Sequence, residues 1–227
     1  MRHTLLYIAT LFLLTACQQE ELPQGAQALG YLSLSAVEIE AGDVQLISTR
    51  AEDTDNLMVT LTPTNGDGKL TECPCSETIS CQPGTYTLEI YNQAYKDKAD
   101  AAQYYYKHEE PVVITEGETN DDVEPISVPM INFGVTFSWP KDLEGFTGIK
   151  FKVSYGSVLK EIQTGETAYF DVLTEENKIS YTLSAQNADG EDMETAGSYG
   201  DGENEAIKAC TIYTVTYSLE TQTLEVE

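Results

Sequence analysis

Four cysteines in the body of the chain have the chemistry to form disulfides or to bind a metal. Cys73, Cys75 and Cys81 lie close together in the sequence, and Cys210 lies far from them. In an exported protein four thiols allow three pairings, and Cys73 or Cys75 joined to Cys81 would close a short loop. A four-thiolate zinc site is the alternative, but Cys73-Pro74-Cys75 lacks the two-residue spacer of such sites. We predict disulfides among these four cysteines and no metal site.

Three consecutive tyrosines are the candidate residues for binding a glycan. Tyr104, Tyr105 and Tyr106 follow a connection that already holds Tyr91 and Tyr95. Exposed aromatic rings can stack on the apolar faces of sugars, while carboxylates accept hydrogen bonds from the hydroxyls. The alternative, which we favour, is that alternate rings cover the edge of a sheet and keep their hydroxyls in water.

The sequence holds little that would support catalysis. Apart from His3 near the N-terminus, His108 is the only histidine, and neither a P-loop nor a Gly-x-Ser-x-Gly elbow is present. His108 lies beside Glu109 and Glu110 and is predicted to be a loop residue rather than a base. Carboxylates are abundant, yet nothing marks the pair that a glycosidase holds across its cleft. We predict no enzyme, no catalytic residue and no cofactor.

The chain is strongly acidic. Asp and Glu outnumber Lys and Arg by 38 to 12, which gives a formal net charge of −26. Such a surface repels phosphate backbones, so nucleic acid is excluded as a partner. Acidic turns at 65–68, 189–192 and 200–205 offer oxygen ligands without EF-hand spacing, so calcium binding is a minor alternative to simple chain reversal.

The first residues predict export. Arg2 is followed by an apolar run from Leu5 to Leu14. A helix that spans a bilayer needs about 20 residues, so this run fits the apolar part of a signal peptide instead. It ends in Leu14-Thr15-Ala16-Cys17, which resembles the lipobox of bacterial lipoproteins. We predict cleavage before Cys17; the alternative is an ordinary signal peptide whose Cys17 later joins a disulfide.

A lipid on Cys17 would hold the mature protein on a membrane. In lipoproteins the thiol of this cysteine receives a diacylglycerol, and the new N-terminus is acylated, for example with palmitate. Several acyl chains on one residue give durable anchoring where one chain does not. The next residues, Gln18-Gln19-Glu20-Glu21, resemble the surface-export signal of Bacteroidetes lipoproteins, although a plain solvated tether has a similar composition. We therefore predict a lipid-anchored protein of the outer membrane that faces the cell exterior.

The elements that carry these residues are predicted to be β-strands. Apolar and polar side chains alternate at period two, and turn signals such as Pro83-Gly84 separate the alternating runs. The stretch Tyr95–Gln103 is the one segment that favours a short helix. The alternation predicts strands around residues 32–36, 57–61, 86–90, 112–114, 126–128, 133–139, 149–155, 179–183 and 213–219.

This pattern predicts an all-β protein with two tandem β-sandwich domains. Strands at such spacing, joined by turns rich in Asp and Gly, are typical of sandwiches. We expect a signal peptide over residues 1–16, an acylated linker over 17–28, and sandwich domains over 29–128 and 129–227. One continuous sandwich is the alternative.

The order of several short segments resembles the DUF4493 family of Bacteroides-type lipoproteins over nearly the whole mature chain. That family is similar to the wider fimbrillin group, whose members are lipoproteins built from two transthyretin-like β-sandwiches. The chain departs from the family pattern at Met130, where a cysteine is often seen, and in the additional Cys73-Pro74-Cys75. Besides the lipobox, the segments are Gly30–Ser35, Thr49–Ala51, Ile79–Thr87, Tyr104–Tyr106 before Val112–Ile114, and Asn132–Phe137.

The resemblance implies a role for Arg50. Fimbrillins are cut after an arginine in the first domain, which releases an N-terminal strand, and a strand of the next subunit enters the vacated groove. Arg50 is the only arginine after the signal peptide, and it lies in a polar stretch from Ser48 to Asn56. Exposed loops of this kind are where proteases cut. Arg50 is thus a possible processing site, and the simpler alternative, which we favour, is an ordinary loop arginine.

These features predict a non-catalytic surface lipoprotein that acts in adhesion or as a fimbrial subunit or anchor. The alternative is a glycan-binding outer-membrane lipoprotein that assists polysaccharide uptake. The expected partners are the membrane, through the lipid, and either other fimbrial subunits or host or dietary glycans.

Overall fold

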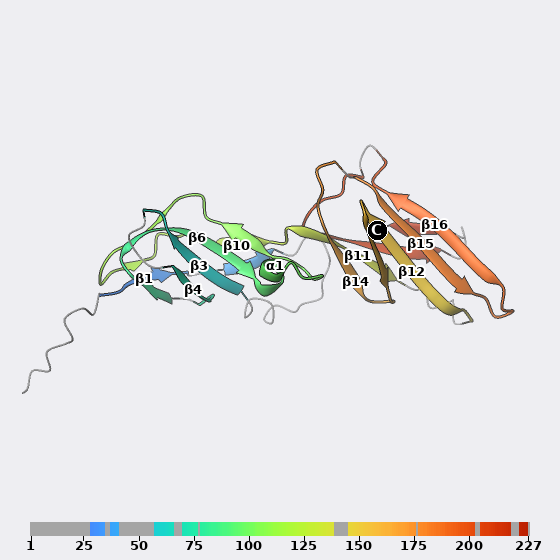
Figure 1. Ribbon diagram of the computed structural model, residues 1–227, viewed down its shortest axis with the longest axis horizontal. Helices are drawn as coiled ribbons and strands as arrows, with labels where there is room; N and C mark the ends of the chain where they lie inside the picture. The colour runs from blue at the N-terminus through green and yellow to red at the C-terminus, as the bar shows by residue number, and fades with distance from the viewer. Residues whose placement is uncertain are drawn as a thin grey trace, which may run out of the picture.

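The structure, a computed structural model, consists almost wholly of β-strands (Figure 1). The helix α1 (Gln93–Asp97) is the one helix in the described part of the chain. No helix among the described residues has the length and apolar character that crossing a bilayer requires. The predicted all-β fold class is confirmed. The structure describes residues 28–34, 37–40, 57–65, 70–76, 78–138, 145–175, 177–202, 205–218 and 223–226.

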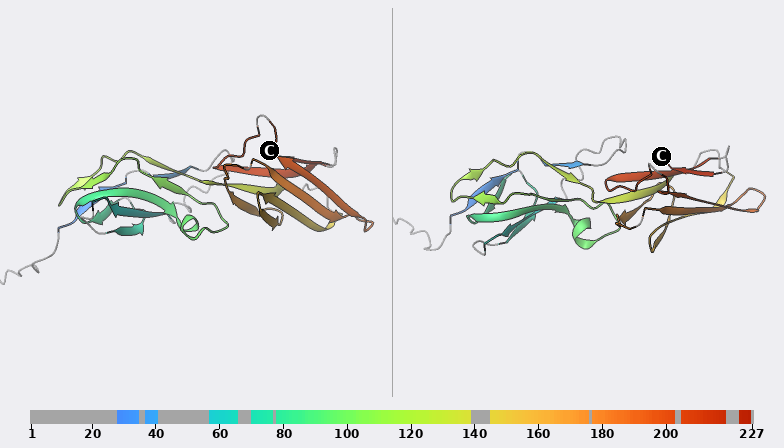
Figure 2. Two further views of the ribbon diagram at one scale, coloured as in Figure 1. Left: turned by 45° about the horizontal axis from the view of Figure 1, so that its top comes forward. Right: turned by 90° about the horizontal axis from the view of Figure 1, so that it is seen from above.

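The strands up to β10 form one end of the molecule, which we call the N-terminal lobe (Figure 1). The largest sheet has the order β4-β3-β6-β7, with β8 paired to the same β6. Opposite it lie a sheet β5-β1-β9 and a parallel pair β10-β2 (Figure 2). The strands are β1 (Gly30–Ser33), β2 (Val37–Glu40), β3 (Leu57–Pro63), β4 (Thr71–Pro74), β5 (Thr78–Cys81), β6 (Gly84–Asn92), β7 (Tyr105–Lys107), β8 (Val112–Ile114), β9 (Thr119–Asn120) and β10 (Ile126–Pro129).

The remaining strands form the C-terminal lobe, a sandwich of two four-stranded sheets. One sheet has the order β14-β11-β17-β18 and the other β13-β12-β15-β16. The β11–β17 pair is parallel, and the other pairs in the two sheets are antiparallel. The strands are β11 (Asn132–Ser138), β12 (Thr147–Tyr155), β13 (Val158–Ile162), β14 (Thr167–Asp171), β15 (Ile179–Gln186), β16 (Asp192–Tyr199), β17 (Thr211–Ser218) and β18 (Thr223–Val226).

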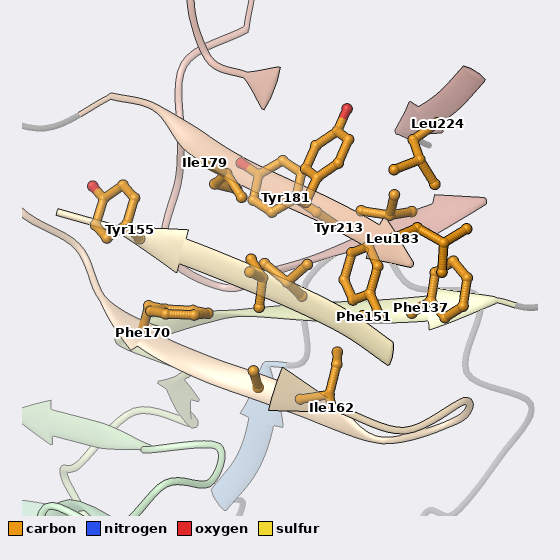
Figure 3. Packing of buried hydrophobic residues seen from close by; sticks show 14 of the residues in the cluster. Phe137, Phe151, Tyr155, Ile162, Phe170, Ile179, Tyr181, Leu183, Tyr213 and Leu224 are labelled. Atoms are coloured by element: carbon orange, nitrogen blue, oxygen red, sulfur yellow. The ribbon is translucent and has the colours of Figure 1, made fainter. Parts of the chain in front are cut away.

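The buried apolar residues form two clusters, one in each lobe. The alternation in the sequence places them: in β3, Leu57, Val59 and Leu61 are buried while the residues between them are more exposed. In the C-terminal lobe the rings of Phe137 and Phe151, from facing sheets, stack with centroids 4.4 Å apart (Figure 3). The first cluster runs from Leu32 to Met130 and the second from Phe133 to Leu224. The expected domain boundary after residue 128 stays a prediction.

The loop between α1 and β7 is fixed by two asparagines. The side-chain oxygen of Asn132 accepts from the N–H of Gln103 at 3.0 Å, and its amide donates to the carbonyl of Ala101 at 2.9 Å. The side-chain oxygen of Asn92 accepts from the N–H of Tyr104 at 3.1 Å. Because Asn132 begins β11, these bonds attach the loop of one lobe to the first strand of the other.

The predicted helix over Tyr95–Gln103 is wrong in its extent. Asn92 starts the helix earlier, since its side chain accepts from the N–H of Tyr95 at 3.0 Å as an N-cap. Lys98 ends it in the left-handed region, with φ of 51°. The residues after Lys98 form the loop that leads to β7, where the two asparagines satisfy their backbone groups.

Candidate functional site

The first strand, β1, has a strand partner on each side. It pairs antiparallel with β5, where Gly30 lies opposite Cys81, and parallel with β9, where Tyr31 lies opposite Thr119. The N–H of Tyr31 also donates to the carbonyl of Glu118 at 2.9 Å. Within the described ranges, β5 and β9 pair with no strand other than β1. The pairing of both neighbours therefore depends on β1.

The strand β1 also contributes to the core of the N-terminal lobe. Leu32 is fully buried, and Leu34 is 4% exposed. Gly30 leaves room for the neighbouring chain, because a Cβ at this position would lie 2.2 Å from the carbonyl oxygen of Thr115. Burying a leucine side chain contributes about 1.5–3 kcal/mol. Backbone pairing and apolar burial together hold β1 in place.

The next strand, β2, continues along the same path but is less buried. It pairs in parallel with β10, with Val37 opposite Ile126. Val37 and Ile39 are partly buried against the core, whereas Glu38 and Glu40 are exposed. The predicted lipidation site Cys17 and the predicted processing site Arg50 both lie outside the described residues.

The three predicted tyrosines lie on two faces of β7 and of the residue that precedes it, Tyr104, which forms an isolated bridge with Met130. Tyr104 is 9% exposed and belongs to the N-terminal core, and Tyr106 packs against the same core. The hydroxyl of Tyr105 donates to a carboxylate oxygen of Glu89 at 2.8 Å. The arrangement of Tyr104 and Tyr106 fits the sheet-covering alternative, and glycan contact by these residues stays a prediction.

Tyr105 belongs to a group of aromatic rings that we call the tyrosine cluster, formed by Tyr91, Tyr95 and Tyr105. Tyr95 stacks on Tyr105 with centroids 4.6 Å apart, and Tyr91 lies 6.0 Å from Tyr95. The hydroxyl of Tyr91 shares a hydrogen bond of 2.9 Å with that of Thr60. Burial, together with the hydrogen bond to the Glu89 carboxylate, raises the pKa of Tyr105 to about 12. The phenol therefore keeps its proton and donates to Glu89 at neutral pH.

All four described cysteines contact the N-terminal core, and three of them lie on β4, on β5 and on the residue after β4. Cys73 and Cys75 lie on one face of β4 and the residue that follows it, and both pack against the cluster that contains the buried Cys81. Burial raises the pKa of each of these thiols, and the nearby Cys73 raises those of Cys75 and Cys81 further. All four cysteines are free thiols in the structure. The predicted disulfides stay a prediction.

Cys210 lies elsewhere, where the two lobes meet. Its thiol donates to the carbonyl of Glu40 at 3.1 Å, at the end of β2, while Cys81 pairs with Gly30 at the start of β1. Cys81 and Cys210 are therefore placed beside two different strands, β1 and β2.

Two of the three predicted acidic turns have side-chain oxygens that bind their own backbone, and residues 66–68 of the third lie outside the described residues. The side-chain oxygen of Asn187 accepts from the N–H groups of Asp189 and Glu191, at 3.0 and 2.9 Å. A carboxylate oxygen of Glu205 accepts from Gly200 and Gly202, both at 3.1 Å. Among the described residues, no group of three or more His, Cys, Asp or Glu side chains is placed to hold a metal ion. These contacts fit the chain-reversal interpretation of the turns.

A cavity of about 220 Å³ lies where the lobes meet, and none of the predicted site residues lines it. One wall is the loop after α1, and the other is formed by β13 and β14. The sequence carries no signal for it, because its residues are far apart and come together only when the lobes pack. The lining consists of Lys98, Ala99, Asp100, Gln103, Asn132, Tyr155, Val158, Lys160, Tyr169, Phe170, Asp171 and Leu173.

Comparison with known proteins gives one family match and several structural similarities. Residues 28–226 match the family model described as domain of unknown function (DUF4493), and no curated protein matches the chain. The tip fimbrial protein Mfa3 from Porphyromonas gingivalis, with a C-terminal truncation, is 9% identical over 88% of this chain and 98% of that chain, with a TM-score of 0.45. A proposed adhesin from Bacteroides ovatus is 14% identical over 82% of this chain and 87% of that one, with a TM-score of 0.37. Another from the same species is 10% identical over 92% and 94%, with a TM-score of 0.41.

Proposed function

We propose that this chain, which belongs to DUF4493, a family of domains of unknown function, is a non-catalytic surface lipoprotein. In this proposal it acts in adhesion or as a fimbrial subunit or anchor. Its N-terminal signal and the segment ending in Cys17 support a lipid anchor on the outer membrane. The body of the molecule is then held outside the cell, where binding is the activity that a tethered β-sandwich can perform.

The observation that carries the fimbrial part of the proposal is the placement of β1. This strand lies between β5 and β9, which have no other strand partner in the described part of the chain, and it buries Leu32 completely. Its loss would uncover apolar core and two strand edges at once. Exposed edges of this kind pair readily with a strand from another chain.

Arg50 gives such a strand a route of release. It lies between β2 and β3 in the sequence, so a cut after Arg50 would separate β1 and β2 from the rest of the lobe. The fragment would then be held only by hydrogen bonds and apolar contacts. We propose that a protease makes this cut at the cell surface and that a strand of the next subunit fills the groove.

The chain permits a sharp test because Arg50 is the only arginine after the signal peptide. An arginine-specific endopeptidase should cut the purified chain from Gln18 to Glu227 once and give a product that begins at Ala51. The cut protein should bind a synthetic peptide of residues 28–40 after the released fragment is removed. The Arg50→Lys variant, which keeps the charge, should stay uncut and should not bind the peptide.

Surface protein from the native cell provides the second arm of this test. Mass spectrometry should find chains that begin at Ala51 in polymeric fractions. Finding only acylated, full-length chains would contradict the assembly role, while leaving the anchored adhesion role in place.

The glycan-binding alternative is supported by the tyrosine cluster. Tyr95 and Tyr105 are partly exposed rings, and Glu89 and Glu72 lie on the two strands that flank β3, each opposite Thr60. Because Tyr104 is part of the core, the informative variants are Tyr95→Ala and Tyr105→Ala rather than a change of Tyr104. Under this alternative both variants lose retention on a polysaccharide column and still assemble.

A further inference from the structure

We infer that the cavity between the two lobes binds a single sugar ring of a neutral glycan. This inference deepens the adhesion proposal by naming a ligand class and its site, and it rests on that proposal only for the exposure of the site on the cell surface. It is independent of any cut after Arg50, since β1 contributes no lining residue.

The cavity wall is fixed before any ligand arrives. The carboxylate of Asp100 accepts from the ammonium of Lys160 at 2.7 Å and from the N–H of Tyr169 at 3.1 Å. Lys160 also donates to the carbonyl of Tyr169 and lies 4.7 Å from the ring centroid of Phe170. Asn132 holds the other end of the same loop through Gln103. Such pre-formed walls lower the cost of ordering a site on binding.

Two charged groups at the cavity have no ion-pair partner among the described residues. Lys98 and Asp171 line it, and neither takes part in the four ion pairs formed among the described residues. Together with Lys160 and Asp100 they give two positive and two negative groups, so the lining carries no net charge. It offers acceptors on the aspartates and donors on the lysines within one small space.

The rim of the cavity is apolar and exposed. Val158 is 45% and Leu173 is 44% exposed, and both line the cavity. Their neighbours Leu159 and Val172 are exposed as well but do not line the cavity, so four of the eight exposed large apolar residues in the described part of the chain lie on these two segments. Covering such surface gains about 25 cal/mol for each Å² removed from water. A ligand with an apolar face therefore gains by lying against this rim.

A sugar ring matches this combination. Its hydroxyls both donate and accept, which suits aspartate and lysine together, and its C–H face is apolar. Anionic sugars are disfavoured, because the chain as a whole carries a net charge of −26. The volume of about 220 Å³ has room for one ring rather than for a longer chain.

Ligand-observed NMR on the purified chain from Gln18 onward tests the inference. The probes are glucose, galactose, mannose and N-acetylglucosamine at millimolar concentration, with glycine as a zwitterionic competitor. At least one sugar should show saturation transfer. Asp171→Ala and Lys98→Gly should each weaken its binding about tenfold or more, because each removes a charged hydrogen-bonding group. Glycine is chosen for Lys98 because φ there is 51°.

Control variants and a folding check show whether a loss of sugar binding is specific to the cavity. Asp189→Ala removes an exposed aspartate from a turn outside the cavity and should leave sugar binding unchanged. Circular dichroism checks that each variant is folded. The inference is overturned if no sugar binds, if glycine alone binds, or if Asp171→Ala binds as the parent does. Loss of binding in Tyr105→Ala but not in Asp171→Ala would move the site to the tyrosine cluster.

Discussion

At the scale of single residues, a few polar side chains decide where the lobes meet. Asn132 is 1% exposed and uses its oxygen and its amide on the loop after α1. Asp100 then attaches this loop to Lys160 and to the backbone of Tyr169 in the other lobe. A buried amide with both ends bonded favours one conformation, because any other leaves a polar group unsatisfied. These residues convert a connecting loop into a rigid wall.

Tyr105 gives a prediction about alkaline pH. Its ordinary pKa of 10.0 is raised to about 12 in the folded chain. Below pH 10 the phenol is protonated in both states and does not make the stability depend on pH. Above it the unfolded chain loses this proton first, so the free energy of unfolding should fall as the pH rises from about 10 to 12. Tyr105→Phe should reduce the slope of this fall, as measured by urea unfolding at several pH values; an unchanged slope would contradict the raised pKa.

At the scale of elements, the strands differ in how many partners they have. Central strands such as β3, β6, β12 and β15 pair on both sides, while β4, β13, β16 and β18 lie at edges. β1 is unusual because it is a four-residue strand whose two neighbours pair only with it in the described part of the chain. A short strand in such a place contributes more to its sheet than its length suggests.

Truncating Leu32 tests the contribution of β1. Leu32→Ala should lower the free energy of unfolding of the N-terminal lobe by about 2–5 kcal/mol, because it leaves a cavity in a closed core. Tyr31→Ala is the matched control on the same strand, since Tyr31 is 39% exposed and points the other way. Hydrogen exchange should show faster exchange in β5 and β9 for the leucine variant. Equal effects of the two substitutions would mean that β1 is not held by burial.

The packing of β4 and β5 on one core favours one disulfide among the possible pairs. Cys73 and Cys81 lie on strands of two different sheets that cover the same core. Burial raises the pKa of the Cys81 thiol, and Cys73 is close enough to raise it further. We therefore predict that an oxidising disulfide of a small thiol converts Cys73 and Cys81 to a disulfide and is itself reduced to two thiols. Peptide mapping of the unreduced protein should find this pair, and Cys210→Ser should not alter it. A bond between Cys210 and any other cysteine would contradict the placement of Cys210 between the lobes.

At the scale of the whole molecule, charge and length suit a tethered surface protein. The net charge of −26 keeps such chains apart from one another and from anionic surfaces. The two lobes lie end to end (Figure 1). The N-terminal lobe contains β1, and the C-terminal lobe is at the other end of the molecule. Because β1 follows the linker from Cys17 in the sequence, release of β1 and release from the anchor are coupled in the proposed function.

The anchor itself predicts how the whole protein distributes. Expressed with its own signal in a bacterial host that acylates lipoproteins, the chain should enter the detergent phase of a Triton X-114 extract. Cys17→Ser should move it to the aqueous phase, because the acyl chains supply the membrane affinity. Cys210→Ser is the control and should stay in the detergent phase. Recovery of the parent chain from the aqueous phase would remove the basis for an outer-membrane location.

The strands that periodicity found and those it missed differ in a physical way. The alternation in 57–61, 86–90, 149–155 and 179–183 predicted β3, β6, β12 and β15, each of which lies inside a sheet. Among the edge strands it predicted β8 and β10, but it did not predict β4, β13, β16 or β18. A strand inside a sheet must bury one face in full, so its alternation is complete. An edge strand is more exposed, as in Val158–Ile162, where the first two residues are both exposed, and its pattern is weaker.

The sequence by itself determined the all-β class, the internal strands and the acidic surface, because each follows from the types and local spacing of neighbouring residues. Only the tertiary structure decided that Tyr104 belongs to the core while Tyr105 joins Tyr95, that Cys210 lies beside Glu40, and that Asp100 meets Lys160 at a cavity. These contacts join residues far apart in the chain, and they depend on strand register and on the packing of one lobe against the other. Local patterns carry no information about either, since the same alternation is compatible with many pairings.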